Sequence, residues 1–71
     1  MAYEVKLETT GNIWKVMVAA GDKVEAGQVL FIMEVMKMEV PYEAPCDGVV
    51  KSLKIAEGDV VKEDDLAIVI G

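Results

Sequence analysis

Hydrophobic and polar residues alternate over short stretches of this chain, and a period of two predicts β-strands rather than helices. Residues 3–7 alternate cleanly, and residues 13–18 do so except at Met17. Residues 29–33 and 66–70 are continuous apolar runs, which we interpret as buried strands. No window keeps a helical period over three turns. The pattern predicts about eight short strands, at residues 3–7, 13–18, around 24, 29–33, 40–42, 49–55, 60–61 and 66–70.

The chain repeats itself when it is shifted by 37 residues, so that Gly11–Glu34 overlies Gly48–Gly71 without a gap. Most apolar positions coincide, and so do the turn residues. A period that occurs only twice indicates a duplication rather than a solenoid. Two four-strand halves can bury their apolar faces against each other, so we predict an all-β flattened barrel or sandwich of eight strands with approximate twofold symmetry, in one domain covering residues 1–71. The identical pairs are Gly11 and Gly48, Ala19 and Ala56, Gly21 and Gly58, Asp22 and Asp59, and Val24 and Val61.

Residues 34–39 lie at the junction between the two halves and predict the tip of a hairpin. With Met36 and Lys37 as the central turn residues, Glu34 faces Glu39, although opposed like charges destabilise a ladder. Neither Gly nor Asn is present to favour a primed turn, so we expect a type I turn. Two methionines and a lysine at an exposed tip depart from ordinary turn preferences without contributing to the fold. Such departures indicate a functional site. The symmetry places the chain termini at the opposite end.

Composition and charge exclude several functions. The net charge is −6 and the seven basic residues are all lysines, so we expect no nucleic-acid partner and no contact with anionic membranes. One cysteine, Cys46, and no histidine exclude an internal disulfide, a common zinc site and a Ser-His-Asp triad. No apolar run is long enough to span a bilayer, and the first residues do not resemble a signal peptide. We expect a cytoplasmic protein with no catalytic residues and no metal.

The segment 34–38, Glu-Val-Met-Lys-Met, resembles the Glu-Ala-Met-Lys-Met attachment motif of biotin carboxyl carrier domains, a branch of the biotinyl/lipoyl attachment family. Residues 21–30 and 44–50 also resemble family segments, so the resemblance covers essentially the whole chain. It departs from the family at Val35, where Ala is usual, and at Asp64-Asp65, where many members have a glycine turn.

The resemblance implies the flattened barrel, with biotin in amide linkage to Lys37 and with Met36 and Met38 beside the cofactor. It also implies that a biotin protein ligase recognises Glu34, Val35 and Glu39. The loaded domain would then carry carboxylate between a biotin carboxylase and a carboxyltransferase or decarboxylase subunit, while catalysing nothing itself. Two alternatives stay open. A lipoyl carrier shares the fold but typically lacks the methionine pair, although a small single-domain member could be a dual acceptor of biotin and lipoyl groups. A plain interaction module would use the acidic surface.

Overall fold

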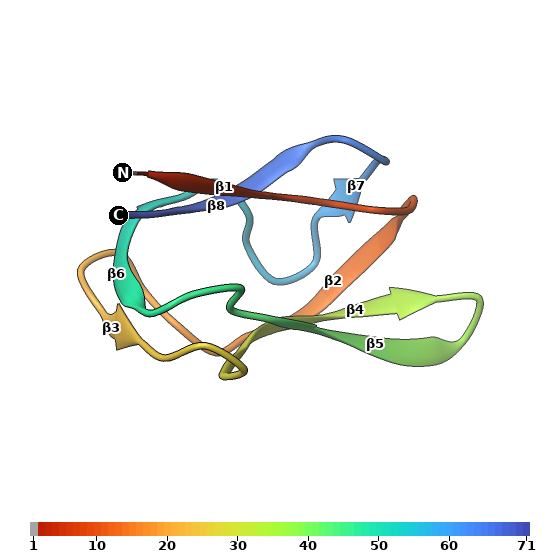
Figure 1. Cartoon of the computed structure of the whole chain (residues 1–71). Helices are drawn as coiled ribbons and strands as arrows, with labels where there is room; N and C mark the ends of the chain where they lie inside the picture. Colours follow the sequence, from red (N-terminus) through yellow and green to blue (C-terminus); the bar gives the residue numbers. More distant parts are fainter. Residues whose placement is uncertain (1) are drawn as a thin grey trace.

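Two antiparallel four-stranded sheets face each other, as the computed structural model shows (Figure 1). The structure describes residues 2–71, and in this range it contains eight strands and no helix. The predicted all-β class and strand number are confirmed. The strands are β1 (Tyr3–Lys6), β2 (Gly11–Val16), β3 (Lys23–Val24), β4 (Val29–Val35), β5 (Met38–Glu43), β6 (Gly48–Leu53), β7 (Val60–Val61) and β8 (Leu66–Ile70).

The two halves of the chain interleave instead of forming one sheet each. One sheet has the order β1-β8-β6-β3 and the other β5-β4-β2-β7, so each contains two strands from each half. A shift of 37 residues maps one sheet onto the other, strand for strand, which confirms the predicted pseudo-twofold symmetry. The expectation that the halves bury their faces against each other as separate layers was too simple. Alternation shows which residues point inward, but it does not show which strands are neighbours.

Two glycines mark strand starts. The Ala-Pro-Cys-Asp-Gly composition of residues 44–48 predicts a turn that includes Gly48, but Gly48 begins β6, just as Gly11 begins β2. Neither position has room for a side chain. A Cβ on Gly11 would lie 2.7 Å from the Glu34 carbonyl oxygen, and one on Gly48 would lie 2.6 Å from Ile70 Cγ2. Both glycines therefore permit a close approach between neighbouring strands.

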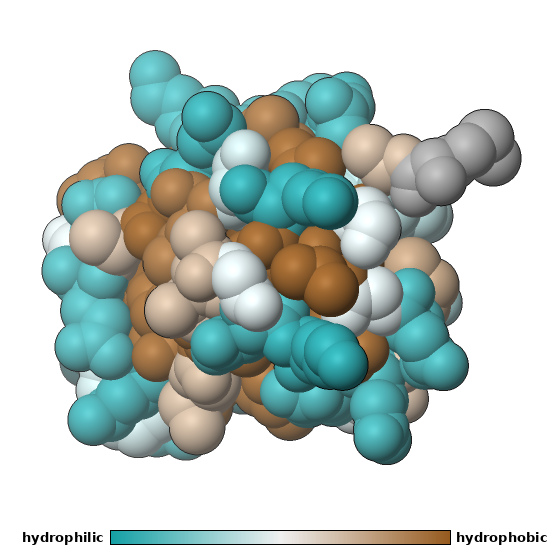
Figure 2. Space-filling view, turned by 90° about the vertical axis from the view of Figure 1, so that its left-hand side faces the viewer, coloured by the Kyte–Doolittle hydropathy of each residue, from teal (hydrophilic) through white to brown (hydrophobic). Residues whose placement is uncertain are grey.

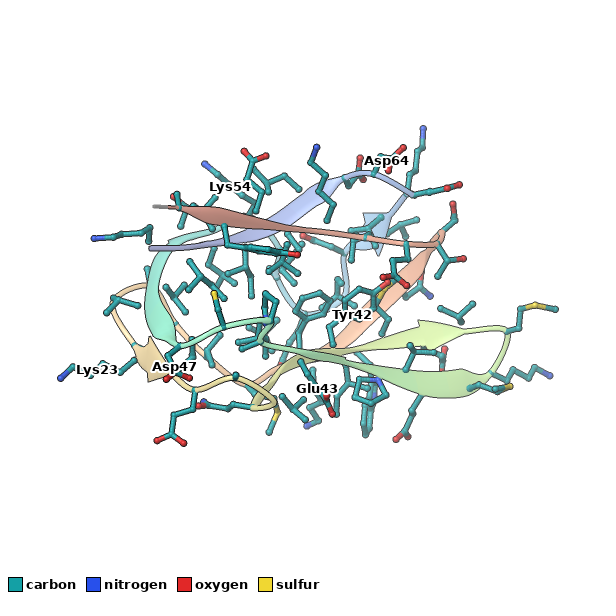
Figure 3. All side chains as sticks on the ribbon, in the orientation of Figure 1. Lys23, Tyr42, Glu43, Asp47, Lys54 and Asp64 are labelled. Atoms are coloured by element: carbon teal, nitrogen blue, oxygen red, sulfur yellow. The ribbon has the colours of Figure 1, made fainter. Side chains whose placement is uncertain are left out.

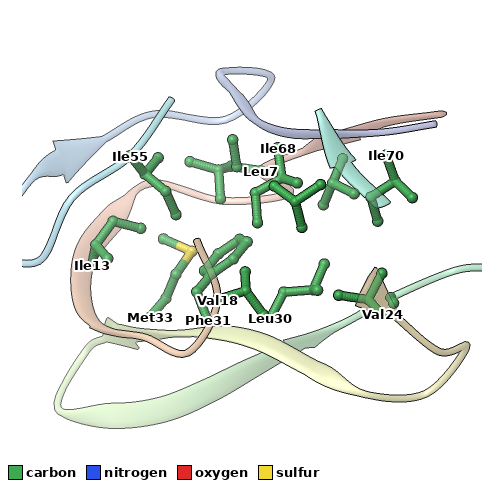
Figure 4. Close-up of a cluster of buried hydrophobic side chains, with 14 of the residues drawn as sticks. Leu7, Ile13, Val18, Val24, Leu30, Phe31, Met33, Ile55, Ile68 and Ile70 are labelled. Atoms are coloured by element: carbon green, nitrogen blue, oxygen red, sulfur yellow. The ribbon is translucent and has the colours of Figure 1, made fainter. Parts of the chain in front are cut away.

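Aliphatic side chains from both sheets and the aromatic ring of Phe31 fill the space between the layers (Figure 4). β-Bulges change the alternation of inward and outward residues in β4 and β8. Leu30 is skipped in the pairing of β4 with β5, and Ala67 is skipped in the pairing of β8 with β1. As a result the consecutive residues Leu30 and Phe31 are both fully buried. This explains why the runs at 29–33 and 66–70 appear continuous rather than alternating.

Matching turns close the two halves with matching hydrogen bonds. The Asp22 carboxylate accepts a bond from the Ala19 amide at 2.9 Å, and the Asp59 carboxylate accepts one from the Ala56 amide at 2.9 Å. Gly21 and Gly58 have φ values of 95° and 92°, a left-handed conformation that glycine adopts without strain. The repeated Gly-Asp pairs are thus a structural requirement of the turn.

The termini lie together at one end of the molecule and the β4–β5 hairpin lies at the other (Figure 1). Tyr3 pairs with Ile70 across β1 and β8, as the symmetry predicted. Figure 2 looks onto the end with the termini, where hydrophilic side chains project around exposed apolar ones. No segment of residues 2–71 forms a helix of the length and apolarity that crossing a bilayer requires.

Candidate functional site

The β4–β5 hairpin brings together all six residues singled out from the sequence. Its register pairs Val35 with Met38, Glu34 with Glu39 and Met33 with Val40, as predicted. The two-residue turn between these strands consists of Met36 and Lys37. The hairpin extends beyond the body of the molecule, and side chains project outward from its turn (Figure 3).

The turn itself differs from the expectation. Met36 has a φ of 52° and Lys37 a φ of 65°, and positive φ at both central positions is characteristic of a type I′ turn, so the predicted type I turn was wrong. A type I′ turn matches the right-handed twist of the paired strands, whereas a type I turn would splay them. The ladder therefore imposes a left-handed backbone on two residues that do not favour it. Strain of this kind is typical of functional sites.

Exposure at the tip is high on every side. Met36 is 90% exposed and Met38 is 66% exposed, and Lys37 is also exposed. The one ion pair found in residues 2–71 joins Lys6 to Glu4 at 4.0 Å, so neither Glu34 nor Glu39 holds the Lys37 ammonium. The lysine is thus free to enter the active site of another protein.

The base of the hairpin is anchored in the core. Val35 and Val40 are half-buried and pack against the buried cluster, so the side chain of Val35 faces the interior while Glu34 faces solvent. Farther along, Phe31 stacks on Tyr42 with ring centroids 4.7 Å apart. The hydroxyl of Tyr42 also accepts a hydrogen bond from the Glu8 amide at 3.0 Å, which ties the hairpin to the β1–β2 loop. Packing therefore anchors the base of the hairpin, while the side chains at its tip are exposed to solvent.

Sequence reasoning missed one residue of the site. Gly11 lies against the base of the hairpin, where a Cβ would come within 3.0 Å of both Met33 Cε and Val35 Cγ2. In the sequence, only its alignment with Gly48 in the repeat pointed to Gly11. Its close contact with the β4–β5 hairpin is visible only in the structure.

Neighbouring surface features are separate from the tip. A hollow of about 400 Å³ lies between the β1–β2 loop and β5, and it is lined by Glu8, Thr9 and residues 40–43. Tyr42 and Glu43 are labelled in Figure 3. Cys46 is half-buried and packs against the core, as expected of a structural cysteine.

A rigid barrel that presents one solvated lysine at a strained hairpin tip defines a carrier of a covalently attached group. Comparison with known proteins agrees. The model of the family described as "Biotin-requiring enzyme" matches residues 3–70. The chain therefore belongs to the biotin/lipoyl attachment family, whose domains carry a group and are not catalysts.

Individual relatives support the same assignment. The biotin/lipoyl attachment protein of Bacillus subtilis (strain 168) is 48% identical over 64 residues, which cover 90% of this chain and 88% of that protein. The biotinylated protein TB7.3 homolog of Mycobacterium leprae (strain TN) is 39% identical over 70 residues, 99% of each chain. A crystal structure of the Kluyveromyces lactis urea carboxylase matches with a TM-score of 0.91 and 39% identity, over all of this chain and 6% of that one. These findings identify the chain as a biotin carrier, and they do not favour a lipoyl carrier.

Proposed function

We propose that Lys37 is the residue to which biotin is attached. The observation that carries this proposal is the position of Lys37 at the apex of the β4–β5 hairpin, at the end of the molecule farthest from the termini. Its side chain provides a primary amine on a flexible four-carbon stem, which is the chemistry that amide formation with the biotin carboxyl group requires. Met36 and Met38 are exposed on either side and form an adaptable apolar seat for the ligase and for partner enzymes.

Loading requires a biotin protein ligase, because Lys37 has no ion-pair partner within residues 2–71 that could take its proton. In the loading step the Lys37 Nζ attacks the carbonyl carbon of an activated biotinyl group, a C–N bond forms, the activating group leaves, and the ammonium proton passes to a base of the ligase. Glu34 and Glu39, which face solvent beside the tip, are the residues that we expect the ligase to recognise directly. Val35 contributes by fixing the base of the hairpin in the core.

When bound, biotin supplies the group that takes up and releases carboxylate. The barrel then acts by tethering, since it raises the local concentration of the loaded lysine at two successive active sites. We propose that these belong to a biotin carboxylase and to a carboxyltransferase or decarboxylase subunit. The match to a urea carboxylase, of which this chain spans 6%, supports carboxylases as the class of partner, and the partner determines the acceptor substrate. The cytoplasmic setting stays a prediction from composition.

Intact-mass spectrometry of the protein produced together with a biotin protein ligase and biotin tests the attachment site. We expect one biotinyl group on the native chain and none on Lys37→Arg, which keeps the charge of the side chain. Lys54→Arg is the matched control, because Lys54 is exposed on the other sheet and should leave loading unchanged. Biotin on Lys37→Arg would refute the attachment site, and a lipoyl mass on the native chain would refute the choice of cofactor.

A further inference from the structure

The outer face of the β5-β4-β2-β7 sheet carries an apolar row behind the tip. Pro41 pairs with Ile32, and Ile32 pairs with Lys15 beside the bulged residue Trp14. Trp14 is 44% exposed, Pro41 is exposed and Ile32 is half-buried. We call Trp14, Ile32 and Pro41 the Trp14 row. The Nζ of Lys15 lies 5.5 Å from the Trp14 ring centroid, so one face of the indole is held in place while part of the ring stays open to solvent.

The pseudo-twofold symmetry provides an internal comparison for this row. The equivalent of Trp14 on the other sheet is Lys51, which is the bulged residue of β6 just as Trp14 is of β2. The equivalent of Pro41 is Glu4, in the edge strand β1. The same scaffold positions therefore accept charged residues, and the fold itself does not require an indole or a pyrrolidine there.

Two further exposed apolar residues also have charged residues at the symmetry-related positions. Met17 is 57% exposed and Val60 is 76% exposed, and their equivalents on the other sheet are Lys54 and Lys23. Figure 3 labels both lysines. Val60 pairs with Asn12 and so lies on the same outer face as the Trp14 row. Trp14, Met17 and Val60 thus place apolar side chains where the symmetry-related positions carry lysines, whereas the equivalent of Ile32 is the apolar Val69.

The Trp14 row is separated from the attachment site by a single polar row. Between it and the turn lies the cross-strand row Glu39, Glu34 and Asn12, on the same outer face. Ile32 precedes Met36 by four residues, which places the Trp14 row roughly 13 Å behind the turn at about 3.3 Å per residue of strand. A protein that engages Lys37 with an interface of ordinary size would reach this distance. Its surface would meet two carboxylates first and an apolar patch behind them.

We propose that the Trp14 row is the docking surface for the biotin protein ligase, an inference that rests on the proposed attachment of biotin to Lys37. The ligase must distinguish Lys37 from the other lysines, and all seven are exposed, so exposure alone cannot select it. A ligase that fits this face would have an apolar pocket for the indole of Trp14. It would also have basic residues that pair with Glu34 and Glu39 nearer the tip. Aromatic anchors surrounded by polar groups are the usual centres of binding energy in protein interfaces.

Steady-state biotinylation kinetics of Trp14→Gln and Lys51→Gln test this proposal. The two substitutions introduce the same side chain at equivalent bulges on opposite faces, so any general effect on the fold is shared. Trp14→Gln should raise KM for the carrier by about tenfold or more with kcat unchanged, the pattern expected when only binding is lost. Lys51→Gln should leave KM within about twofold of the native value, and thermal melts should show both variants folded.

A second measurement uses the fact that Trp14 is the sole tryptophan of the chain. A carrier labelled with 5-fluorotryptophan and bearing Lys37→Ala gives one fluorine resonance, which should shift or broaden when unlabelled ligase is added. Unchanged KM for Trp14→Gln together with an unmoved resonance would overturn the docking surface while leaving Lys37 as the attachment site. Equal losses in both glutamine variants would overturn it as well, and so would slower use of loaded Trp14→Gln by a carboxylase with normal loading. A native chain that acquires no biotin would overturn the proposed function, and this inference with it.

Discussion

Replacing Met36 with glycine should stabilise the protein, although it removes a residue of the functional tip. Met36 is 90% exposed and has a φ of 52°, so the substitution removes almost no packing but relieves a left-handed backbone. That conformation costs a residue other than glycine about 1–2 kcal/mol. The extra freedom of glycine in the unfolded chain offsets about 0.5–1 kcal/mol of this gain. The net expectation is a free energy of unfolding higher by about 0.5–1 kcal/mol.

Met38→Gly is the matched control, because the chemistry of the change is identical but the backbone is not. Met38 begins β5 outside the left-handed region and is 66% exposed, so a third of its surface is buried. Losing that burial and placing glycine in a strand should lower the free energy of unfolding by about 1–2 kcal/mol. The two variants should therefore differ by about 2 kcal/mol, or roughly 10 °C in Tm.

Urea denaturation followed by circular dichroism, with thermal melts in parallel, measures both values. We expect the midpoints to move in opposite directions from that of the native protein, with unchanged m-values. If Met36→Gly destabilises the protein as much as Met38→Gly, the turn is not strained and the argument for strain at the tip is refuted. If Met36 contributes to the proposed apolar seat for the ligase, Met36→Gly should be a poorer substrate in the biotinylation assay despite its higher stability.

Other substitutions test the scaffold. Asp22→Ala and Asp59→Ala each remove the carboxylate that accepts an amide hydrogen bond in equivalent turns, so each should cost about 1 kcal/mol, and urea melts should show the two losses equal and additive. Unequal or coupled losses would contradict the symmetry of the turns. Gly48→Ala should lower the free energy of unfolding by about 1–3 kcal/mol through overpacking against Ile70. Gly21→Ala should lower it by about 1–2 kcal/mol through the positive φ alone. Only Gly48→Ala should shift the Ile70 methyl resonances in NMR spectra. Tyr42→Phe keeps the stack on Phe31 but loses the acceptor for the Glu8 amide, so it should cost about 0.5–1 kcal/mol and speed hydrogen exchange at Glu8, and unchanged exchange would show that this bond is absent in solution.

The strand pattern and the tip could be predicted because both depend on local residues. Alternation places Ile13 and Val5 inward, and the register of residues 33–40 follows once Met36 and Lys37 are taken as the turn. The turn type could not be predicted from those residues, because the twist of the completed ladder overrides their backbone preferences. Local propensity favoured type I, and the sheet imposed type I′.

Pairing between distant strands was the part that the sequence left open. Nothing in Gly48 distinguishes a turn residue from a strand residue, since the reason for the glycine is the close approach of Ile70, which lies 22 residues later in the chain. The same holds for Trp14. Its apolar character is visible in the sequence, but only the position of the bulge and the comparison with Lys51 show that the scaffold does not need it.

The interleaved strand order means that neither half of the chain can exist as a folded unit. Four of the six strand pairings join one half to the other, namely β1 with β8, β3 with β6, β2 with β7 and β4 with β5. A fragment ending at Val35 would keep only the β2–β4 pair and could complete itself only by exchanging strands with another copy. The architecture is thus that of two intertwined four-strand units, and the Met36-Lys37 turn is the link between them. The peptide segment that joins the two repeats is also the place where the lysine stands.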